Sequence, residues 1–176
     1  MLASHLDAET RYSLIRSEAL NVTTELLRTQ VNSRLRATDI NAMALSASKE
    51  WEQSNTRIKN WDWVEGYSAH KFRYPKRFEM ALWNADRLIG LSMGRPTYHG
   101  IALRLDVVEA APIDLGDRPP ILRSTLLGYE IYGTLINARQ IRIMHPVNQE
   151  VKSYYETYGY QYVEKGDYLF KDISPL

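Results

Sequence analysis

Glycine and proline are absent from the first third of this 176-residue chain, because all nine glycines and all seven prolines lie beyond residue 65. Both residues break helices and form turns, so their absence predicts helix over most of this third. An apolar stripe at helical spacing predicts a first helix within residues 7–37. Asp39 stands where a helix N-cap belongs. It predicts a second helix with one apolar face made of Ile40, Met43, Ala44, Ala47 and Trp51.

Beyond residue 76 the apolar residues alternate with a period of two, which is the spacing of a β-strand. The predicted elements are strands over 77–83, 87–93 and 101–108, then a helix over 121–137. A short turn between the first two strands predicts an antiparallel hairpin. On the third strand, simple alternation places Leu103, Leu105 and Val107 on one face.

The stretch from residue 140 to 160 combines a strand, a capped helix and the start of another strand. The strand over 141–144 ends at Pro146, since proline cannot continue a ladder. Asn148 then occupies the N-cap position of a helix, and Gly159 closes that helix as its C′ residue. The last predicted strands cover 160–163 and 168–173.

This order of elements predicts one mixed α/β domain, with a mainly antiparallel sheet flanked by helices. We expect a helical N-terminal extension over residues 1–38, packed on a domain over residues 39–176. An amphipathic first helix usually marks ordinary packing. It also leaves open a homodimer interface or another partner surface.

Bulk properties exclude several classes of protein. A net charge of +1 argues against a protein built around nucleic-acid contact. The absence of cysteine excludes disulfides and a thiol nucleophile, and it fits a reducing compartment. The four histidines are scattered without ligand spacing, so we expect no metal. No secretory signal or membrane-spanning apolar run is visible, so we expect a cytoplasmic protein without a membrane partner.

Residues 70–77, with the sequence H-K-F-R-Y-P-K-R, interleave positive charge and aromatic rings. Such a pattern can hold nucleic acid through phosphate contacts and base stacking. The alternative is a solvated connection into the next strand, with Trp61 and Trp63 buried beside it. The short length of the segment and the nearly neutral chain favour the connection. A nucleic-acid or ribonucleoprotein binder is therefore the third hypothesis for the function.

The last helix resembles a motif of the Gcn5-related N-acetyltransferase (GNAT) family. Members often read N-x-x-A-x-x-x-Y-x-x-x-G-F, and the residues here at the same spacings are Asn148, Val151, Tyr155, Gly159 and Tyr160. The order of elements from the second helix onward is also similar to that family. The resemblance implies an acyl-CoA N-acyltransferase-like fold. It also implies acetyl-CoA-dependent transfer of an acetyl group to an amine of a small molecule or protein.

The resemblance further implies roles for individual residues. Tyr155 takes the position of the acid that protonates the leaving thiolate, and Asn148 lies near the bound acetyl-CoA. The third strand would hold the thioester carbonyl through the backbone of Val107 and Val108. A carboxylate near the substrate would serve as general base. The candidates for the base are Asp106, Glu109 and Glu79, with His99 as a further alternative.

The chain departs from the family pattern where the family binds the pyrophosphate of CoA. Members have R/Q-x-x-G-x-G/A at a helix N-terminus, whereas residues 112–120 read P-I-D-L-G-D-R-P-P. The aspartates add negative charge, and Pro119 and Pro120 remove two backbone donors. Arg118 and Arg123 would then hold the phosphates through their side chains. A GNAT-like fold that has lost cofactor binding and serves as an interaction module is therefore the second hypothesis.

Overall fold

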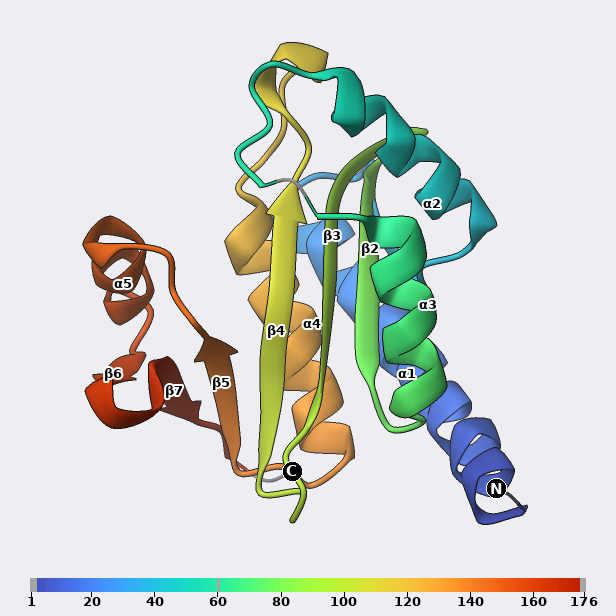
Figure 1. Cartoon of the computed structure of the whole chain (residues 1–176), viewed down its shortest axis with the longest axis vertical. Helices are drawn as coiled ribbons and strands as arrows, with labels where there is room; N and C mark the ends of the chain where they lie inside the picture. Colours follow the sequence, from blue (N-terminus) through green and yellow to red (C-terminus); the bar gives the residue numbers. More distant parts are fainter. Residues whose placement is uncertain (1–2, 60, 175–176) are drawn as a thin grey trace.

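A seven-stranded sheet forms the centre of the molecule in the computed structural model, which describes residues 3–59 and 61–174 (Figure 1). The strand order is β1-β2-β3-β4-β5-β7-β6. The strands are β1 (Leu35–Thr38), β2 (Phe78–Asn84), β3 (Arg87–Pro96), β4 (Ala102–Ala110), β5 (Gln140–Met144), β6 (Gln161–Val163) and β7 (Tyr168–Asp172). Neighbouring strands are antiparallel apart from β4 and β5, which are parallel. The predicted mixed, mainly antiparallel sheet is confirmed.

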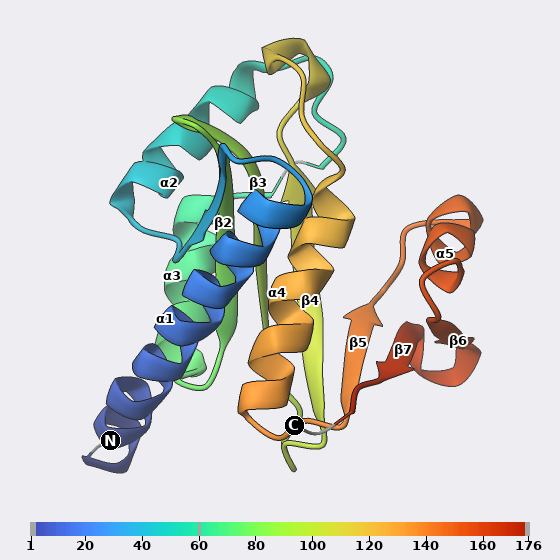
Figure 2. The ribbon, with the colours of Figure 1, turned by 180° about the vertical axis from the view of Figure 1, so that it is seen from behind.

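Helices cover both faces of this sheet. The helices are α1 (Ala3–Gln30), α2 (Ala42–Ser48), α3 (Trp63–Arg73), α4 (Ile121–Leu135) and α5 (Gln149–Glu156), with 3-10 turns η1 (Lys49–Gln53), η2 (Ile113–Leu115) and η3 (Glu164–Gly166). Figures 1 and 2 show α2 and α3 on one face, α1 and α4 on the other, and α5 at one edge. The predicted division at residue 38 stays a prediction. Within the described residues, no helix has the length and apolar character needed to cross a lipid bilayer.

The core lies on both sides of the sheet. On the α1–α4 side, the ring of Phe78 stacks on that of Tyr132 with 4.6 Å between centroids, and Leu105 is buried in the same cluster. On the α2–α3 side, Trp63 and Trp83 are each 2% exposed. Burial on both faces explains why β2 reads as a nearly continuous apolar run rather than a strict alternation.

The first helix is shorter than predicted. α1 ends at Gln30, and residues 35–37, predicted as helix, belong to the edge strand β1, which pairs with β2. The intervening turn uses Asn32, whose side chain accepts a hydrogen bond from the N–H of Arg34 at 2.9 Å. The helical prediction for 35–37 is wrong because pairing with a distant strand overrides local propensity.

Two element boundaries also differ from the predictions. Asn41, rather than Asp39, caps α2, because its side chain accepts a hydrogen bond from the N–H of Ala44 at 2.9 Å. The second strand of the hairpin, β3, continues through Gly94 to Pro96, where a loop is predicted. Pairing with β4 extends this strand, and such pairing leaves no local signal in the sequence.

A helix that the sequence does not predict, α3, includes the first half of the segment interpreted as a solvated connection. Asp62 caps its N-terminus, and Trp63, Tyr67 and His70 form its buried side. His70 and Arg77, two basic residues of the proposed nucleic-acid segment, are 9% and 2% exposed. The nucleic-acid hypothesis therefore loses two of the side chains on which it depends.

A bulge in β4 changes which side chains share a face. The register with β3 skips Asp106, which is the extra residue. As a result, Val107 packs among the tryptophans on the α2–α3 side, and Val108 packs on the α1–α4 side. The predicted grouping of Val107 with Leu105 is wrong, because alternation alone cannot reveal a bulge.

Candidate active site between strands β4 and β5

Strands β4 and β5 run side by side for only part of their length. Their parallel pairing ends with Leu105 opposite Ile143, although β4 continues to Ala110. β5 stops one residue later, and His145 adopts a φ of 51°, in the left-handed region. In the described pairing, residues 107–110 have strand partners on the β3 side alone. The two strands therefore diverge toward the end of the sheet where α4 begins.

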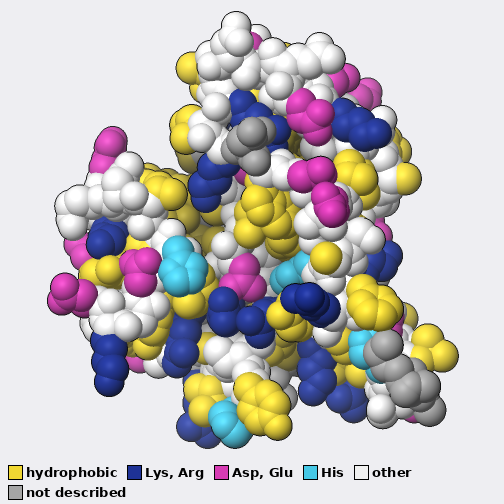
Figure 3. All heavy atoms as spheres, viewed as in Figure 1, with side chains coloured by type: hydrophobic (Ala, Val, Ile, Leu, Met, Phe, Trp, Pro, Cys, Tyr) yellow, Lys and Arg dark blue, Asp and Glu magenta, His cyan; other side chains and the backbone are white. Residues whose placement is uncertain are grey.

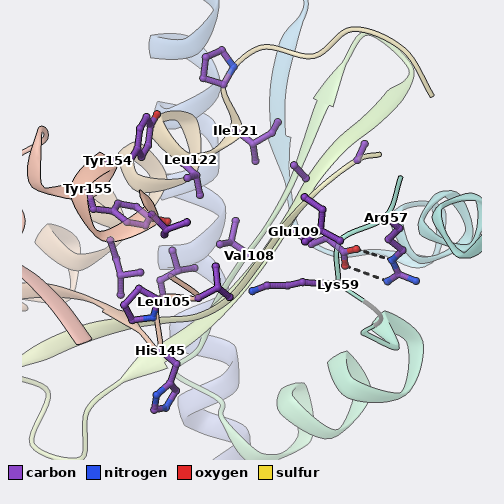
Figure 4. Close-up of a pocket in the computed structure, with 18 of the residues that line it drawn as sticks. Arg57, Lys59, Leu105, Val108, Glu109, Ile121, Leu122, His145, Tyr154 and Tyr155 are labelled. Carbon is purple, nitrogen blue, oxygen red and sulfur yellow. Dashed lines mark hydrogen bonds and ion pairs between the residues drawn. The ribbon is translucent and has the colours of Figure 1, made fainter. Parts of the chain in front are cut away.

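A cavity of about 430 Å³ lies where the strands diverge. Its wall is built by the end of β4, the N-terminus of α4, the end of β5, one side of α5 and the loop 56–59 (Figure 4). Most of the lining is apolar, and includes Leu105, Val108, Ile121, Leu122 and Val151. Figure 3 shows this face of the molecule hollowed beside the lobe that contains α5. Such a volume and lining suit an extended, largely apolar ligand.

Tyr155 lines this cavity from α5. Asn148 caps the helix as predicted, by accepting a hydrogen bond from the N–H of Val151 at 2.9 Å, and Gly159 follows it with a φ of 86°. Burial raises the pKa of the Tyr155 hydroxyl, and the neighbouring Tyr154 adds to the increase. The hydroxyl is therefore protonated at neutral pH and can donate a proton.

The prolines that interrupt the family motif leave the backbone donors of α4 in place. Pro119 and Pro120 precede the helix, with Pro120 at the N-cap, so the N–H groups of the first helical turn are retained. Asp114 accepts hydrogen bonds from the hydroxyls of Ser54 and Thr56, both at 2.6 Å, and these bonds lower its pKa. This carboxylate lines a different cavity, away from the first turn of α4.

Three further residues, Arg118, Arg123 and Asn148, are expected at the cofactor, and of these one lies in the cavity wall and two lie outside it. Arg118 lines the cavity, and its Nε donates to the carbonyl oxygen of Ala111 at 2.8 Å. Arg123 is exposed on the first turn of α4, where its positive charge acts on the hydroxyl of Tyr154. Asn148 is also exposed, and its amide oxygen is used by the helix cap.

On the side of the cavity, the last residues of β4 are not paired with a neighbouring strand. Val108 is part of the cavity lining, whereas the side chain of Val107 points to the opposite face of the sheet. Because the ladder to β5 ends before the bulge at Asp106, the following backbone has no strand partner on that side. Backbone N–H groups in such a position can stabilise a carbonyl oxygen that gains negative charge.

Glu109 also lines the cavity, but its carboxylate is held by two neighbours (Figure 4). Arg57 donates from Nε to one oxygen at 2.7 Å and from Nη2 to the other at 3.2 Å. The indole of Trp63 donates to the second oxygen at 2.6 Å. The ion pair is buried, and it raises the pKa of Arg57. These three hydrogen bonds occupy both carboxylate oxygens of Glu109.

The other candidate bases are also engaged or lie elsewhere. Asp106 lines the cavity but pairs with Arg104 at 2.7 Å and with Arg95 at 3.7 Å. Glu79 is buried on β2, and it lines a cavity beside α1. His99 lies in the loop after β3, at a third cavity. The structure thus brings Asp106 and Glu109 to the site and leaves Glu79 and His99 away from it.

Two basic residues of the cavity, Arg57 and Lys59, are missed by reasoning from the sequence. Ile58, which lies between them, also lines the cavity and is 96% exposed. Arg57 pairs with Glu109, which is far away in the sequence, and such a long-range contact leaves no local signal.

No family model and no curated protein matches the sequence. Solved structures do match the fold. The ribosomal-protein-S18-alanine N-acetyltransferase from Escherichia coli superposes with a TM-score of 0.59 and 14% identity, over 81% of this chain and 96% of that one. A mutant of the spermidine N-acetyltransferase SpeG from Vibrio cholerae gives 0.57 and 17%, over 80% and 95% of the two chains.

An aminoglycoside 6′-N-acetyltransferase complexed with coenzyme A matches with a TM-score of 0.58 and 14% identity, over 81% of this chain and 98% of that one. At these identities the likeness is one of fold. Each of these three proteins is an N-acetyltransferase by its description. The chain therefore has the acyl-CoA N-acyltransferase fold of the Gcn5-related N-acetyltransferases.

Proposed function

We propose that this protein is an acetyl-CoA-dependent N-acetyltransferase that moves an acetyl group directly to an amine of a small molecule or protein. The observation that carries the proposal is the cavity between the diverging ends of β4 and β5, with Tyr155 in its wall and the N-terminus of α4 at its edge. The three structural neighbours support this class of reaction, and the one complexed with coenzyme A supports acetyl-CoA as the donor.

In this proposal the pyrophosphate of acetyl-CoA binds at the N-terminus of α4. Free N–H groups and the helix dipole favour an anion there, and Arg118 and Arg123 add positive charge. The apolar wall formed by Leu105, Val108 and Leu122 would contact the pantetheine arm. Asn148 acts by holding the start of α5, and thereby the position of Tyr155.

The residues around the thioester would then divide the chemistry. Backbone N–H groups of β4 beyond Asp106 stabilise the negative charge on the carbonyl oxygen. Tyr155 protonates the thiolate as the carbon–sulfur bond breaks. Because ion pairs with arginines already engage Asp106 and Glu109, we assign the role of general base to neither. The acceptor amine loses its proton to solvent before attack, so the rate should rise with pH toward the pKa of that amine.

Isothermal titration calorimetry with acetyl-CoA tests the donor site. We expect a Kd in roughly the micromolar range, weakened about tenfold in Arg118→Ala through loss of a charge-assisted contact. Arg34→Ala is the matched control and should bind acetyl-CoA normally. Arg34 is exposed and lies next to β1, the edge strand farthest from β6 in the sheet. Absence of binding at millimolar acetyl-CoA would overturn the enzyme proposal and favour an interaction module.

Turnover is measured separately, as release of free thiol in the presence of candidate amines. The structural neighbours suggest three acceptors to try first: spermidine, an aminoglycoside and a peptide with an N-terminal alanine. Thiol release above the rate of acetyl-CoA hydrolysis, lost in Tyr155→Phe, would support the proposal. Binding without turnover on any amine would leave a donor site without demonstrated catalysis and would count against the transferase.

A further inference from the structure

Lys59 enters the cavity from the loop between η1 and α3. Figure 4 shows its side chain extending toward Leu105 and Val108, away from Ile121 at the start of α4. Tyr155 approaches from the opposite wall, on α5. A primary amine and a phenol therefore flank the space assigned to the thioester. The direction of the lysine does not suit a contact with phosphates at the N-terminus of α4.

Hydrogen bonds hold the chain on both sides of Lys59. The hydroxyl of Thr56 bonds to an aspartate of η2 at 2.6 Å. Arg57 binds the carboxylate of Glu109, and its Nη2 also donates to the carbonyl oxygen of Trp61 at 2.6 Å. These bonds fix the chain on both sides of Lys59 beside the cavity.

Ile58 and Lys59 both line the cavity, but only Lys59 brings a reactive group to it. Ile58 is 96% exposed, whereas Lys59 is partly buried. Among the described residues of the lining, Lys59 has the one primary amine of a side chain. A neutral amine is a nucleophile, which suits attack on a carbonyl carbon held in the same cavity.

We propose that Lys59 is an acetyl acceptor, so that the protein acetylates its own lysine. The proposal rests on the proposed function, since the donor is acetyl-CoA in the same cavity. The amine of Lys59, after losing its proton to solvent, attacks the carbonyl carbon and forms a carbon–nitrogen bond. The carbon–sulfur bond breaks, and Tyr155 protonates the thiolate. The nitrogen releases its second proton to solvent, and Tyr155 regains a proton from solvent. The products are Nζ-acetyl-lysine at position 59 and CoA with a free thiol.

Mass spectrometry of the full-length protein incubated with acetyl-CoA tests the proposal. A protease that cuts after glutamate releases residues 53–65, in which Lys59 is the one lysine. Lys49, which lines a different cavity, reports background chemical acetylation in the same sample. We expect Lys59 to gain an acetyl group at least about tenfold faster than Lys49, because the cavity holds donor and amine together. The first-order rate should not change when the protein is diluted.

Two variants and one binding measurement separate the outcomes. Tyr155→Phe should slow acetylation of Lys59 without changing that of Lys49, and Lys59→Arg should abolish the modified peptide. Acetylation of Lys59 at the background rate, or a rate proportional to protein concentration, would overturn the inference while acetyl-CoA binding by calorimetry still supported the proposed function. No binding of acetyl-CoA at all would overturn both.

Discussion

Tyr155 and Tyr154 are adjacent on α5 but differ in their surroundings. Tyr155 is 2% exposed, and burial raises its pKa. The hydroxyl of Tyr154 lies 3.3 Å from that of Tyr158, and burial followed by this contact raises the Tyr154 pKa to about 12. Both hydroxyls are protonated at neutral pH, so the choice of the acid depends on geometry. Both rings line the cavity, and Tyr155 is the one that matches the family motif and is fully buried.

Replacing Tyr155 with phenylalanine tests that choice. We expect Tyr155→Phe to lower kcat by about 100-fold or more, since general acids contribute roughly 10²–10⁴ to the rate. Acetyl-CoA should bind within about twofold of wild type, because the lost group acts on the leaving thiolate. Tyr154→Phe is the matched control. Steady-state kinetics that show equal losses in the two variants would remove Tyr155 from its proposed role.

The raised pKa of Tyr155 also predicts the pH profile of the enzyme. Because the hydroxyl stays protonated, ionisation of Tyr155 should not reduce kcat up to about pH 9.

Glu109 and Arg57 give a second prediction about single residues. Their side chains are 5% and 7% exposed, so removing one charge leaves the other buried without its partner. We expect Glu109→Gln to lower the free energy of unfolding by roughly 3 kcal/mol. Glu130→Gln is the control, because its ion pair with Lys171 is about one-third exposed. That control should cost less than about 1 kcal/mol. Urea unfolding curves measure both, and similar losses in the two variants would contradict the prediction.

The bulge of β4 determines which residue of this strand faces the cavity. It inserts Asp106 and turns Val108 toward the cavity just where the ladder to β5 ends. Gly94 of β3 pairs with Leu105 beside this bulge. A Cβ atom on Gly94 would overlap the carbonyl oxygen of Arg104, so only glycine fits this close approach of two strands.

Gly94→Ala should therefore disturb both stability and the site. We expect a loss of roughly 3 kcal/mol, since the overlap involves backbone that cannot move without breaking the ladder. Gly100→Ala is the control, because its Cβ meets no atom within 4 Å and only its φ of 70° is unfavourable. That strain costs about 1–2 kcal/mol. Thermal unfolding and acetyl-CoA titration measure the two effects, and a stable Gly94→Ala protein would show that the strands can separate there without loss.

How far each element could be predicted from the sequence depends on the range of the interactions that form it. The cap at Asn148 and the turn at Gly159 are local, so their spacing alone indicates α5. β1 and the bulge at Asp106 depend on partners in distant strands, and neither leaves a local pattern. The same reason hides the place of Lys59 in the cavity wall, because the wall is formed by segments that are distant in the sequence.

A cluster of charged side chains joins α1 to the sheet. Glu9 on α1 accepts a hydrogen bond from Nη1 of Arg77 at 2.7 Å and also pairs with Arg16. Arg77 is 2% exposed and immediately precedes β2. The pair of Glu9 and Arg77 therefore joins the first helix to the sheet. Burial raises the pKa of Glu9, but the two arginines outweigh it, and the pKa is lowered overall.

The lowered pKa of Glu9 predicts how acid affects the whole fold. Its contribution to stability is fully present above its ordinary pKa of 4.5 and is lost as the pH falls through the lower value of the folded state. We therefore expect wild type to lose more stability than Glu9→Gln between about pH 6 and pH 3. Glu18→Gln, which replaces an exposed glutamate of the same helix, is the control and should follow wild type. Urea unfolding followed by tryptophan fluorescence measures all three. Parallel acid profiles for wild type and Glu9→Gln would mean that the charge cluster does not hold α1 to the sheet.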